Sequence, residues 1–233
     1  MNKVLYIILI FLFSLTVISC AKKSDSSSTT SSGLFIAVGA SGTLLTSSDG
    51  TTWTAQTSGT SNNLKGVTYG NSTFIAVGGD GYANGTILTS SDGTTWTART
   101  SGTTNFLNGV TYANSTFVAT GNSGTIYTSS DGTSWTSRTS GTSNSLNGVT
   151  YGNSKFIATG SSGTILTSSD GTTWTSRTGV TSNHLNGVTY ANNSFMTVGD
   201  SGTFLTSSDG KSWSSSWTSI LHPKTLLGVT YKE

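Results

Sequence analysis

Short runs of apolar residues, separated by polar turn residues, recur along the chain from residue 34 onward. In one stretch the runs are 107–112, 117–120, 125–129 and 134–139. Gly, Asn, Ser and Asp lie between them, and turn residues at intervals of about ten are typical of consecutive strands. Because no segment keeps a helical period, the pattern predicts an all-β domain of short strands joined by tight turns.

The pattern of four strands is itself repeated. The string SSDGTTW stands at 47–53, 90–96 and 168–174, with SSDGTSW at 129–135 and SSDGKSW at 207–213. A second string, GVTY, also occurs five times, and consecutive box aspartates are spaced by 39 residues except for one spacing of 43. Units of about 40 residues with four short strands are typical of the blades of a β-propeller. The sequence therefore predicts a five-bladed β-propeller with four-stranded blades.

The order of strands at the two ends of the repeats predicts how the ring closes. The first unit begins at 34–38, which matches the second strand of a blade, whereas 226–231 matches the first strand. If these two segments pair, all five blades are complete and no blade interface stays open. We therefore expect the propeller to be closed by pairing of the C-terminal strand with the N-terminal blade.

The S-D-G-x-x-W string resembles the Asp-box of bacterial neuraminidase (BNR) repeats, whose usual form is S-x-D-x-G-x-T-W. The resemblance covers all five units, roughly residues 34–231, although each string has one residue fewer between Asp and Trp. It implies a structural turn between the third and fourth strands of each blade. The residue types fit this role, because Asp accepts backbone N–H bonds, Gly adopts a positive φ and Trp buries a large ring. The expected box residues are Asp49, Trp53, Asp92, Trp96, Asp131, Trp135, Asp170, Trp174, Asp209 and Trp213.

The sequence predicts no catalytic, metal or cofactor site. One box aspartate per blade is a wider spacing than the about 5–10 Å between the two carboxylates of a glycosidase. Sialidases of the resembling family carry an arginine cluster and a Glu/Tyr pair. Here Arg99, Arg138 and Arg177 lie at equivalent positions of three separate units, and the one glutamate is Glu233. We expect a protein that is not an enzyme, with a glycosidase as the least favoured alternative.

The units differ from one another mainly in the turns opposite the Asp-boxes, and one of these turns has four extra residues within 79–84. Variation on one face of a constant frame is typical of a binding surface, and drift in unconstrained loops is the alternative. The candidate ligand-binding residues are Asn63, Tyr82, Phe106, Asn108, Asn147, His184 and Asn186. Their amides and rings suit glycans or a protein surface.

The first twenty residues resemble a bacterial lipoprotein signal. Lys3 precedes an apolar run that is shorter than the about 20 residues of a membrane-spanning helix. The run ends in Val-Ile-Ser-Cys, which resembles a lipobox and implies cleavage before Cys20 and acylation of its thiol. An ordinary secretory signal is the alternative. We expect a signal peptide at 1–19, a lipidated Ser/Thr-rich tether at 20–33 and the propeller at 34–233.

These features together predict a monomeric lipoprotein of the bacterial outer membrane, held by its lipid anchor and exposed at the cell surface. Its function would be non-catalytic binding of a glycan or an extracellular protein. A periplasmic scaffold or assembly factor for a membrane protein complex is the alternative. Because only 9% of the residues are charged and the net charge is +2, nucleic acid is not an expected partner.

Overall fold

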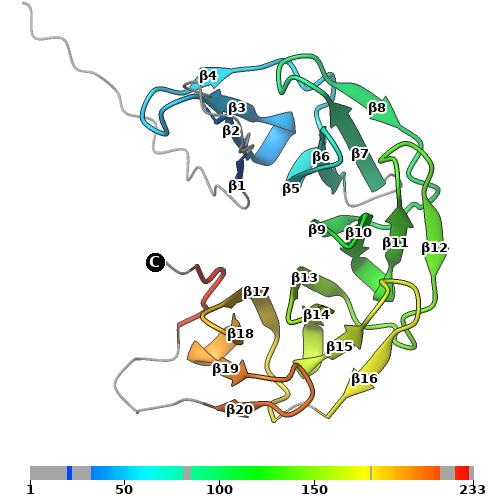
Figure 1. The fold of residues 1–233 in the computed structure, drawn as a ribbon, viewed down its shortest axis with the longest axis vertical. Helices are drawn as coiled ribbons and strands as arrows, with labels where there is room; N and C mark the ends of the chain where they lie inside the picture. Colours follow the sequence, from blue (N-terminus) through cyan, green and yellow to red (C-terminus); the bar gives the residue numbers. More distant parts are fainter. Residues whose placement is uncertain (1–19, 23–32, 81–84, 179, 216–223, 231–233) are drawn as a thin grey trace, which may run out of the picture.

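The computed structural model of the protein describes residues 20–22, 33–80, 85–178, 180–215 and 224–230. Within these residues, twenty strands form five antiparallel four-stranded sheets, and the strands of each sheet follow one another in sequence. The sheets stand side by side along an arc, with the first strand of each sheet innermost (Figure 1). The all-β class is confirmed, and the five sheets agree with the five predicted propeller blades.

The five sheets are named blades 1 to 5. Blade 1 contains β1 (Cys20–Lys22), β2 (Phe35–Val38), β3 (Leu44–Ser47) and β4 (Thr54–Ala55). Blade 2 contains β5 (Asn63–Gly70), β6 (Thr73–Gly79), β7 (Gly85–Ser90) and β8 (Thr97–Arg99). Blade 3 contains β9 (Leu107–Ala113), β10 (Thr116–Gly121), β11 (Ile126–Ser129) and β12 (Thr136–Arg138). Blade 4 contains β13 (Leu146–Gly152), β14 (Lys155–Gly160), β15 (Ile165–Ser168) and β16 (Thr175–Arg177). Blade 5 contains β17 (Leu185–Ala191), β18 (Ser194–Gly199), β19 (Phe204–Ser207) and β20 (Ser214–Ser215).

Two kinds of tight turn join the inner strands of the blades. In blades 2 to 5 the first and second strands are joined by residue pairs such as Asn114 and Ser115, which both have positive φ, as a type I′ hairpin requires. In blades 1, 3, 4 and 5 the second and third strands are joined by 3-10 turns, named η1 (Ala40–Gly42), η2 (Asn122–Gly124), η3 (Ser161–Gly163) and η4 (Asp200–Gly202). Gly124 in η2 has a φ of 68°, and a side chain there would collide with the carbonyl oxygen of Thr142. The turn therefore requires glycine at this position.

The apolar core is divided into four clusters, and each cluster lies between two neighbouring blades. Between blades 2 and 3, Ile75 and Ile87 of the earlier blade pack with Leu107, Phe117 and Trp135 of the later one. All but the tryptophan are almost completely buried. Each blade is thus stabilised chiefly by the face of its neighbour, at about 1.5–3 kcal/mol for each large side chain that is fully buried.

The innermost strands approach one another at repeated glycines. A Cβ atom on Gly109 would lie 3.4 Å from the Cα of Gly148 in the next blade and 3.2 Å from Oγ1 of Thr120. Glycine in the GVTY string therefore allows neighbouring blades to pack closely near the middle of the arc.

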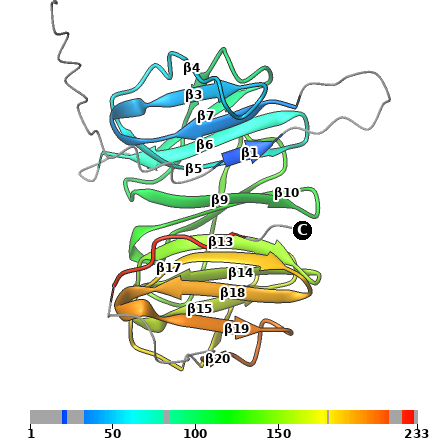
Figure 2. The ribbon, with the colours of Figure 1, turned by 90° about the vertical axis from the view of Figure 1, so that its left-hand side faces the viewer.

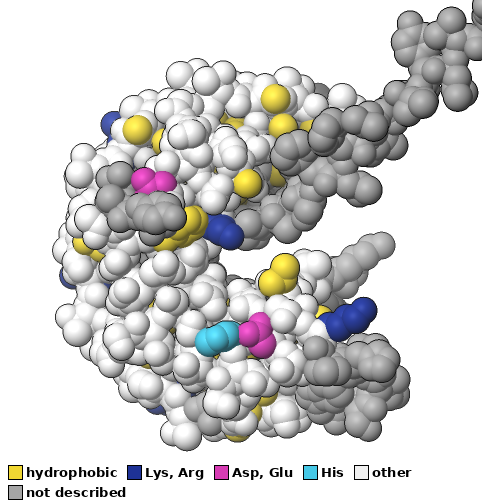
Figure 3. Space-filling model, turned by 180° about the vertical axis from the view of Figure 1, so that it is seen from behind, with side chains coloured by type: hydrophobic (Ala, Val, Ile, Leu, Met, Phe, Trp, Pro, Cys, Tyr) yellow, Lys and Arg dark blue, Asp and Glu magenta, His cyan; other side chains and the backbone are white. Residues whose placement is uncertain are grey.

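The first and last blades each have one apolar face that the described residues leave partly uncovered. The corresponding faces at the four inner interfaces are covered by a neighbouring blade. On blade 1, Trp53 is 38% exposed, whereas the equivalent Trp213 of blade 5 is 6% exposed. On blade 5, Met196 and Phe204 are half-buried, although the residues at their positions in the other blades are 0–1% exposed. The space-filling view shows an open notch between these two ends (Figure 3).

The structure does not show the predicted pairing of 226–231 with the N-terminal blade. The inner edge of β2 is occupied by β1, with Cys20 opposite Ala37, so three residues of the predicted tether form a strand. Residues 224–230 run beside β17 instead (Figure 2). Leu226 N donates to Gly199 O over 3.0 Å and Leu226 O accepts from Asn186, which are the contacts that the first strand of a following blade would make. The pairing is absent because β1 occupies the edge of β2 that this segment would need.

Two buried hydroxyls provide a test of the inter-blade packing. Thr120 and Thr159 are 0% exposed, and their Oγ1 atoms have no hydrogen-bond partner among the described residues. Valine stands at the same position in the other three units. Replacing Thr120 or Thr159 with valine removes an unsatisfied hydroxyl without changing volume. We expect each variant to raise the free energy of unfolding by about 1 kcal/mol in chemical denaturation.

Thr197→Val is the matched control for this prediction. Its hydroxyl is also buried, but it donates to Gly187 O over 2.8 Å. The valine variant loses that bond and leaves a carbonyl without it, so it should be less stable than the wild type. Destabilisation by Thr120→Val or Thr159→Val would show that those hydroxyls are bonded in solution.

Candidate functional site

The turns lie on two opposite faces of the molecule, and hydrogen bonds between neighbouring blades show which turns share a face. On one face, Asn71 Nδ2 donates to Ser130 O of the next Asp-box, and Asn153 Nδ2 donates to Ser208 O in the same way. On the other face, η3 lies against the connection into blade 5, where Gly163 N donates to Asn183 O over 2.9 Å. We call these the box face and the variable face. The variable face carries the 3-10 turns and the connections between blades, where the units differ most.

Each Asp-box is a closed hydrogen-bonded turn. In the third box, the hydroxyl of Ser129 donates to Asp131 Oδ1 over 2.9 Å, and the backbone N–H groups of Thr133 and Ser134 donate to the same oxygen. The indole of Trp135 donates to Gly132 O over 3.0 Å. The same contacts occur in the other four boxes. The shorter string therefore forms a complete turn that uses the carboxylate structurally.

These hydrogen bonds favour the ionised form of every box carboxylate. The Thr52 N–H, followed by the Thr51 N–H and the Ser47 hydroxyl, holds the pKa of Asp49 well below its usual range. The backbone N–H groups of Ser212 and Lys211 lower the pKa of Asp209 to about 2. A general acid needs a pKa near the working pH, so these carboxylates are unsuited to that role.

The lowered pKa values predict how stability depends on pH. An unfolded aspartate has a pKa of about 3.9, and the folded values are lower, so ionisation stabilises the fold fully above that pH. This contribution is lost as the pH falls from about 4 through the folded pKa values. Thermal melting should therefore be nearly constant between about pH 7 and 5, with a steep fall in Tm below about pH 4.

Asp131→Asn tests the origin of that fall. The amide oxygen of asparagine still accepts hydrogen bonds but carries no charge, so the variant should melt lower than the wild type at neutral pH. Its Tm should also change less between about pH 5 and pH 3. An unchanged pH profile in the variant would contradict the role given to the carboxylate.

Three arginines lie at equivalent positions on the outer strands. Nε of Arg99, Arg138 and Arg177 donates to a threonine hydroxyl on the adjacent strand, over 2.8–2.9 Å. In blade 1, Gln56 Nε2 makes the same contact with Thr46. This repetition indicates that the Nε contact belongs to the frame of each blade. The structure keeps the three guanidinium groups on separate blades, as the sequence predicted.

Three of the candidate ligand-binding asparagines bind the blades to one another. The Nδ2 atoms of Asn108, Asn147 and Asn186 donate to the carbonyls of Leu146, Leu185 and Leu226 respectively, each over 3.0 Å. Asn186 Nδ2 also donates to Asp200 Oδ1 over 3.0 Å. The amide nitrogens therefore have a structural role that the sequence analysis did not predict. A ligand contact through their carbonyl oxygens stays a prediction.

Two further candidates, Asn63 and His184, hold the 3-10 turns. Asn63 Oδ1 accepts a bond from Ser41 N over 2.9 Å, and His184 Nδ1 accepts one from Ser162 N over 3.1 Å. Because Nδ1 is the acceptor, Nε2 of His184 is free to face a ligand. Both side chains are exposed on the variable face, so they combine a structural contact with access to solvent.

Lys65 and Phe106 depart from this frame. Lys65 occupies the position of the three inter-blade asparagines, and its Nζ atom lies over the ring of Phe106, 6.0 Å from the centroid. Phe106 is half-buried in the connection that leads into blade 3. The remaining candidate, Tyr82, lies outside the described residues. Lys65 was not predicted as a site residue, although its difference from the asparagine of three other units was a visible signal.

Lys65 and the three inter-blade asparagines line a hollow of about 200 Å³ near the middle of the arc. Its lining repeats one pattern, in which the inner strands of blades 2 to 5 each contribute a polar residue, a glycine and usually a valine, and residues 227–229 add Leu-Gly-Val. Lys65 is the single charged residue in this lining. The hollow is too small for a large ligand, and its mouth on the variable face is the better candidate for contact with a partner.

Figure 3 shows the variable face, on which charged side chains are few and lie apart. In the described part of the chain, no three His, Cys, Asp or Glu side chains are grouped as metal ligands. No helix among the described residues is long and apolar enough to cross a membrane. The arrangement offers hydrogen-bonding groups, one aromatic ring and one cation at the mouth of the hollow.

No family model and no curated protein matches the sequence. Solved structures do match the fold. A structure described as YCF48 bound to D1 peptide has a TM-score of 0.60 and 18% identity, covering 78% of this chain and 62% of that one. The WD40 β-propeller domain of Doa1 has a TM-score of 0.63 and 13% identity, covering 91% and 71%. A GH74 enzyme from Niastella koreensis has a TM-score of 0.58 and 21% identity, covering 78% and 28%.

These similarities show a β-propeller fold. The chain spans less than two thirds of the YCF48 structure and little more than a quarter of the GH74 enzyme. At identities of 13–21%, they do not carry the activity or the partners of those proteins over to this one.

Proposed function

We propose that this protein is a non-catalytic binding module whose variable face takes a protein partner. The observation that carries the proposal is the contact of Phe106 with Lys65, the one charged residue that lines the central hollow. Most other variable side chains on this face are held in inter-blade hydrogen bonds, whereas these two make a contact that departs from the repeat. Aromatic residues are enriched at protein–protein interfaces, where they supply most of the binding energy.

Two further observations support this function. The box carboxylates are bonded within turns and have lowered pKa values, which disfavours acid–base chemistry at the boxes. A propeller of similar fold, YCF48, has been solved with a bound peptide. We include in the proposal that Cys20 is acylated and anchors the module in the bacterial outer membrane, with its variable face available at the cell surface.

Binding to ligand arrays tests whether the variable face takes a protein partner. The full chain with Cys20→Ser should be applied to arrays of extracellular proteins, envelope-derived peptides and glycans. We expect a protein or peptide ligand whose binding weakens about tenfold in Phe106→Ala and less in Lys65→Ala, since a truncated hot-spot residue costs at least about 1 kcal/mol.

The matched control is Ser91→Ala, which truncates an exposed residue of the box face. This variant should bind as the wild type does, and all three variants should keep the wild-type melting temperature. Equal binding by wild type and Phe106→Ala would overturn the site. A signal confined to glycans would overturn the assignment of a protein partner.

A periplasmic scaffold for a membrane protein complex is the second candidate function. The YCF48 structure with its peptide favours it in the same measure, because both functions require a bound polypeptide. Digestion of intact cells with an external protease separates them. Cleavage of the protein supports the surface location, and protection until the outer membrane is opened supports the periplasmic one.

We also propose that the ring closes between its two ends. The exposed Trp53 face of blade 1 and the Met196 and Phe204 face of blade 5 are the two halves of the interface found four times elsewhere. Residues 224–230 already lie where the first strand of a following blade would begin. Transfer of this segment to β2, in place of β1, would complete blade 1 and cover both faces.

Disulfide formation tests the closure. Val110 pairs with Ala119 and Val149 with Ala158, so the repeat predicts that Val229 pairs with Ala37 in a closed ring. In a Cys20→Ser background, the Ala37→Cys/Val229→Cys variant should form an intramolecular disulfide under mild oxidation, because paired strands bring Cβ atoms within reach.

Val110→Cys/Ala119→Cys is the positive control, since that pair is opposed within blade 3 in the open and closed forms alike. A bridge in the control without one between positions 37 and 229 would show that the ring remains open.

A further inference from the structure

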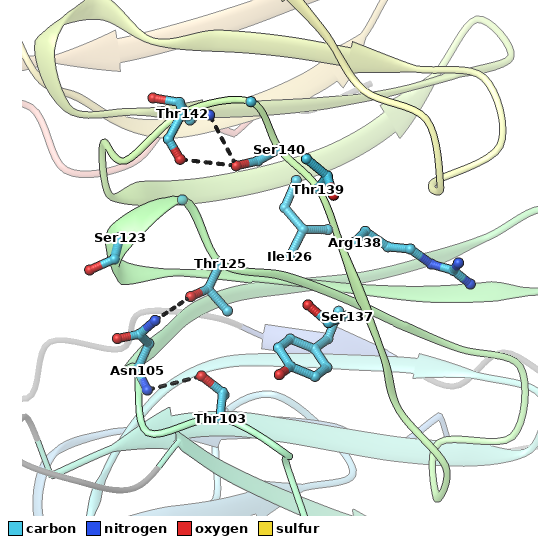
Figure 4. Close-up of a pocket in the computed structure, with 13 residues that line it drawn as sticks. Thr103, Asn105, Ser123, Thr125, Ile126, Ser137, Arg138, Thr139, Ser140 and Thr142 are labelled. Atoms are coloured by element: carbon cyan, nitrogen blue, oxygen red, sulfur yellow. Dashed lines mark hydrogen bonds between the residues drawn. The ribbon is translucent and has the colours of Figure 1, made fainter.

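A groove of about 420 Å³ lies on the outer part of the variable face, over blade 3 and between the connections that enter and leave it (Figure 4). Its floor is formed by η2 and by the start of β11. One wall is the connection that contains Thr103 and Asn105, and the other is the connection 140–142. The volume falls within the range of about 300–1,000 Å³ that small-ligand sites occupy. The residues at the mouth of the central hollow do not line it.

Tyr127 distinguishes this groove from the equivalent positions in the other blades. Leucine stands there in the other four units, as Leu45, Leu88, Leu166 and Leu205. The hydroxyl of Tyr127 donates to Gly102 O over 2.7 Å, which fixes the half-buried ring between two blades. Because the ring is already immobilised, contact with a ligand costs little conformational entropy.

Hydroxyl and amide groups surround this ring. Asn105 Nδ2 donates to the hydroxyl of Thr125 over 2.8 Å, which holds the side chain in place and leaves Oδ1 as an acceptor. The hydroxyls of Ser123, Ser137 and Thr139 make no hydrogen bond with other described residues, so they are available to a ligand. Ile126 is the one aliphatic residue of the lining other than glycine, and it is buried. The groove thus offers many hydroxyls and one ring but no apolar pocket for a peptide side chain.

The groove has a positively charged residue in its lining and no negatively charged one. Arg138 is fixed by the bond from its Nε to Thr128, which puts its side chain on the other side of the sheet from Tyr127, and its guanidinium extends past one end of the groove (Figure 4). Its terminal nitrogens form no ion pair with a described carboxylate, so they can bind an anionic group bidentately.

We propose that this groove binds a saccharide, with a preference for an acidic one such as a uronic acid oligomer. The ring of Tyr127 would stack on the C–H face of one sugar, the hydroxyls and Asn105 would bond its hydroxyl groups, and Arg138 would bind the carboxylate of a neighbouring sugar. This inference goes beyond the protein-binding role assigned to the mouth of the central hollow.

The first experiment compares two probes by isothermal titration calorimetry with the full chain in detergent. The probes are an oligogalacturonate and a neutral oligosaccharide of the same length. We expect tighter binding of the acidic probe. Tyr127→Leu should weaken both probes about tenfold, the equivalent of about 1.4 kcal/mol, while the melting temperature stays unchanged because leucine is the residue of the other units.

A second substitution is also taken from the repeat itself. Arg138→Gln places at the third unit the residue that blade 1 carries as Gln56, whose side chain keeps the same contact with threonine. This variant should lose the preference for the acidic probe and bind the neutral one as the wild type does. Phe106→Ala should bind both saccharides normally, since it alters the other site.

A gain of function completes the test. Leu166→Tyr transfers the ring to blade 4, where Gly141 and Arg177 occupy the positions of Gly102 and Arg138. The number of saccharides bound per chain should rise from one to two. The proposal is overturned if the wild type binds neither saccharide, if Tyr127→Leu binds as well as the wild type, or if a poly-glutamate peptide binds the groove in preference to both sugars.

Discussion

The packing of each blade against its neighbour is the constraint on which the rest of the structure depends. A single four-stranded sheet of this length buries little apolar surface alone, and the core clusters accordingly lie between blades. The inner glycines follow from the same constraint, because a Cβ atom on Gly109 would crowd the backbone of the next blade. A chain built in this way must expose one half-interface at each end unless the ends meet. Trp53, which is exposed, and Met196, which is half-buried, lie on those two uncovered halves in blades 1 and 5.

The same constraint explains why a chain with so few charges has so many fixed polar groups. Each blade must be positioned relative to the next, and hydrogen bonds between turns provide the geometry that apolar contact alone leaves loose. Asn108, Asn147 and Asn186 donate across consecutive interfaces with one common length. The Asp-boxes fix the turns within each blade, because one carboxylate oxygen accepts hydrogen bonds from three donors. Polar residues in this protein therefore belong to the frame unless they depart from the repeat.

Much of the fold could be predicted from sequence because every unit repeats the same strand and turn signals. The predicted strands at 107–112 and 117–120 correspond to β9 and β10, and the box turns lie where expected. The last strand of the unit is shorter than predicted, since Ser134 and Trp135 belong to the box. The β1 strand could not be predicted, because Cys-Ala-Lys carries no repeat signature and its pairing depends on a free edge of β2. Closure depends on that same edge.

The candidate site was harder to predict, because variation between units has two causes that the sequence does not separate. A side chain can differ because it contacts a ligand, or because it makes an equivalent contact by other means, as Asn63 and His184 do at their 3-10 turns. The structure separates these causes by showing which differences leave the frame intact. Tyr127 adds a bond to Gly102 while keeping its strand register, and Lys65 gives up the inter-blade amide for contact with Phe106. Differences that add or remove a contact, rather than replace it, mark the positions where this scaffold has room for recognition.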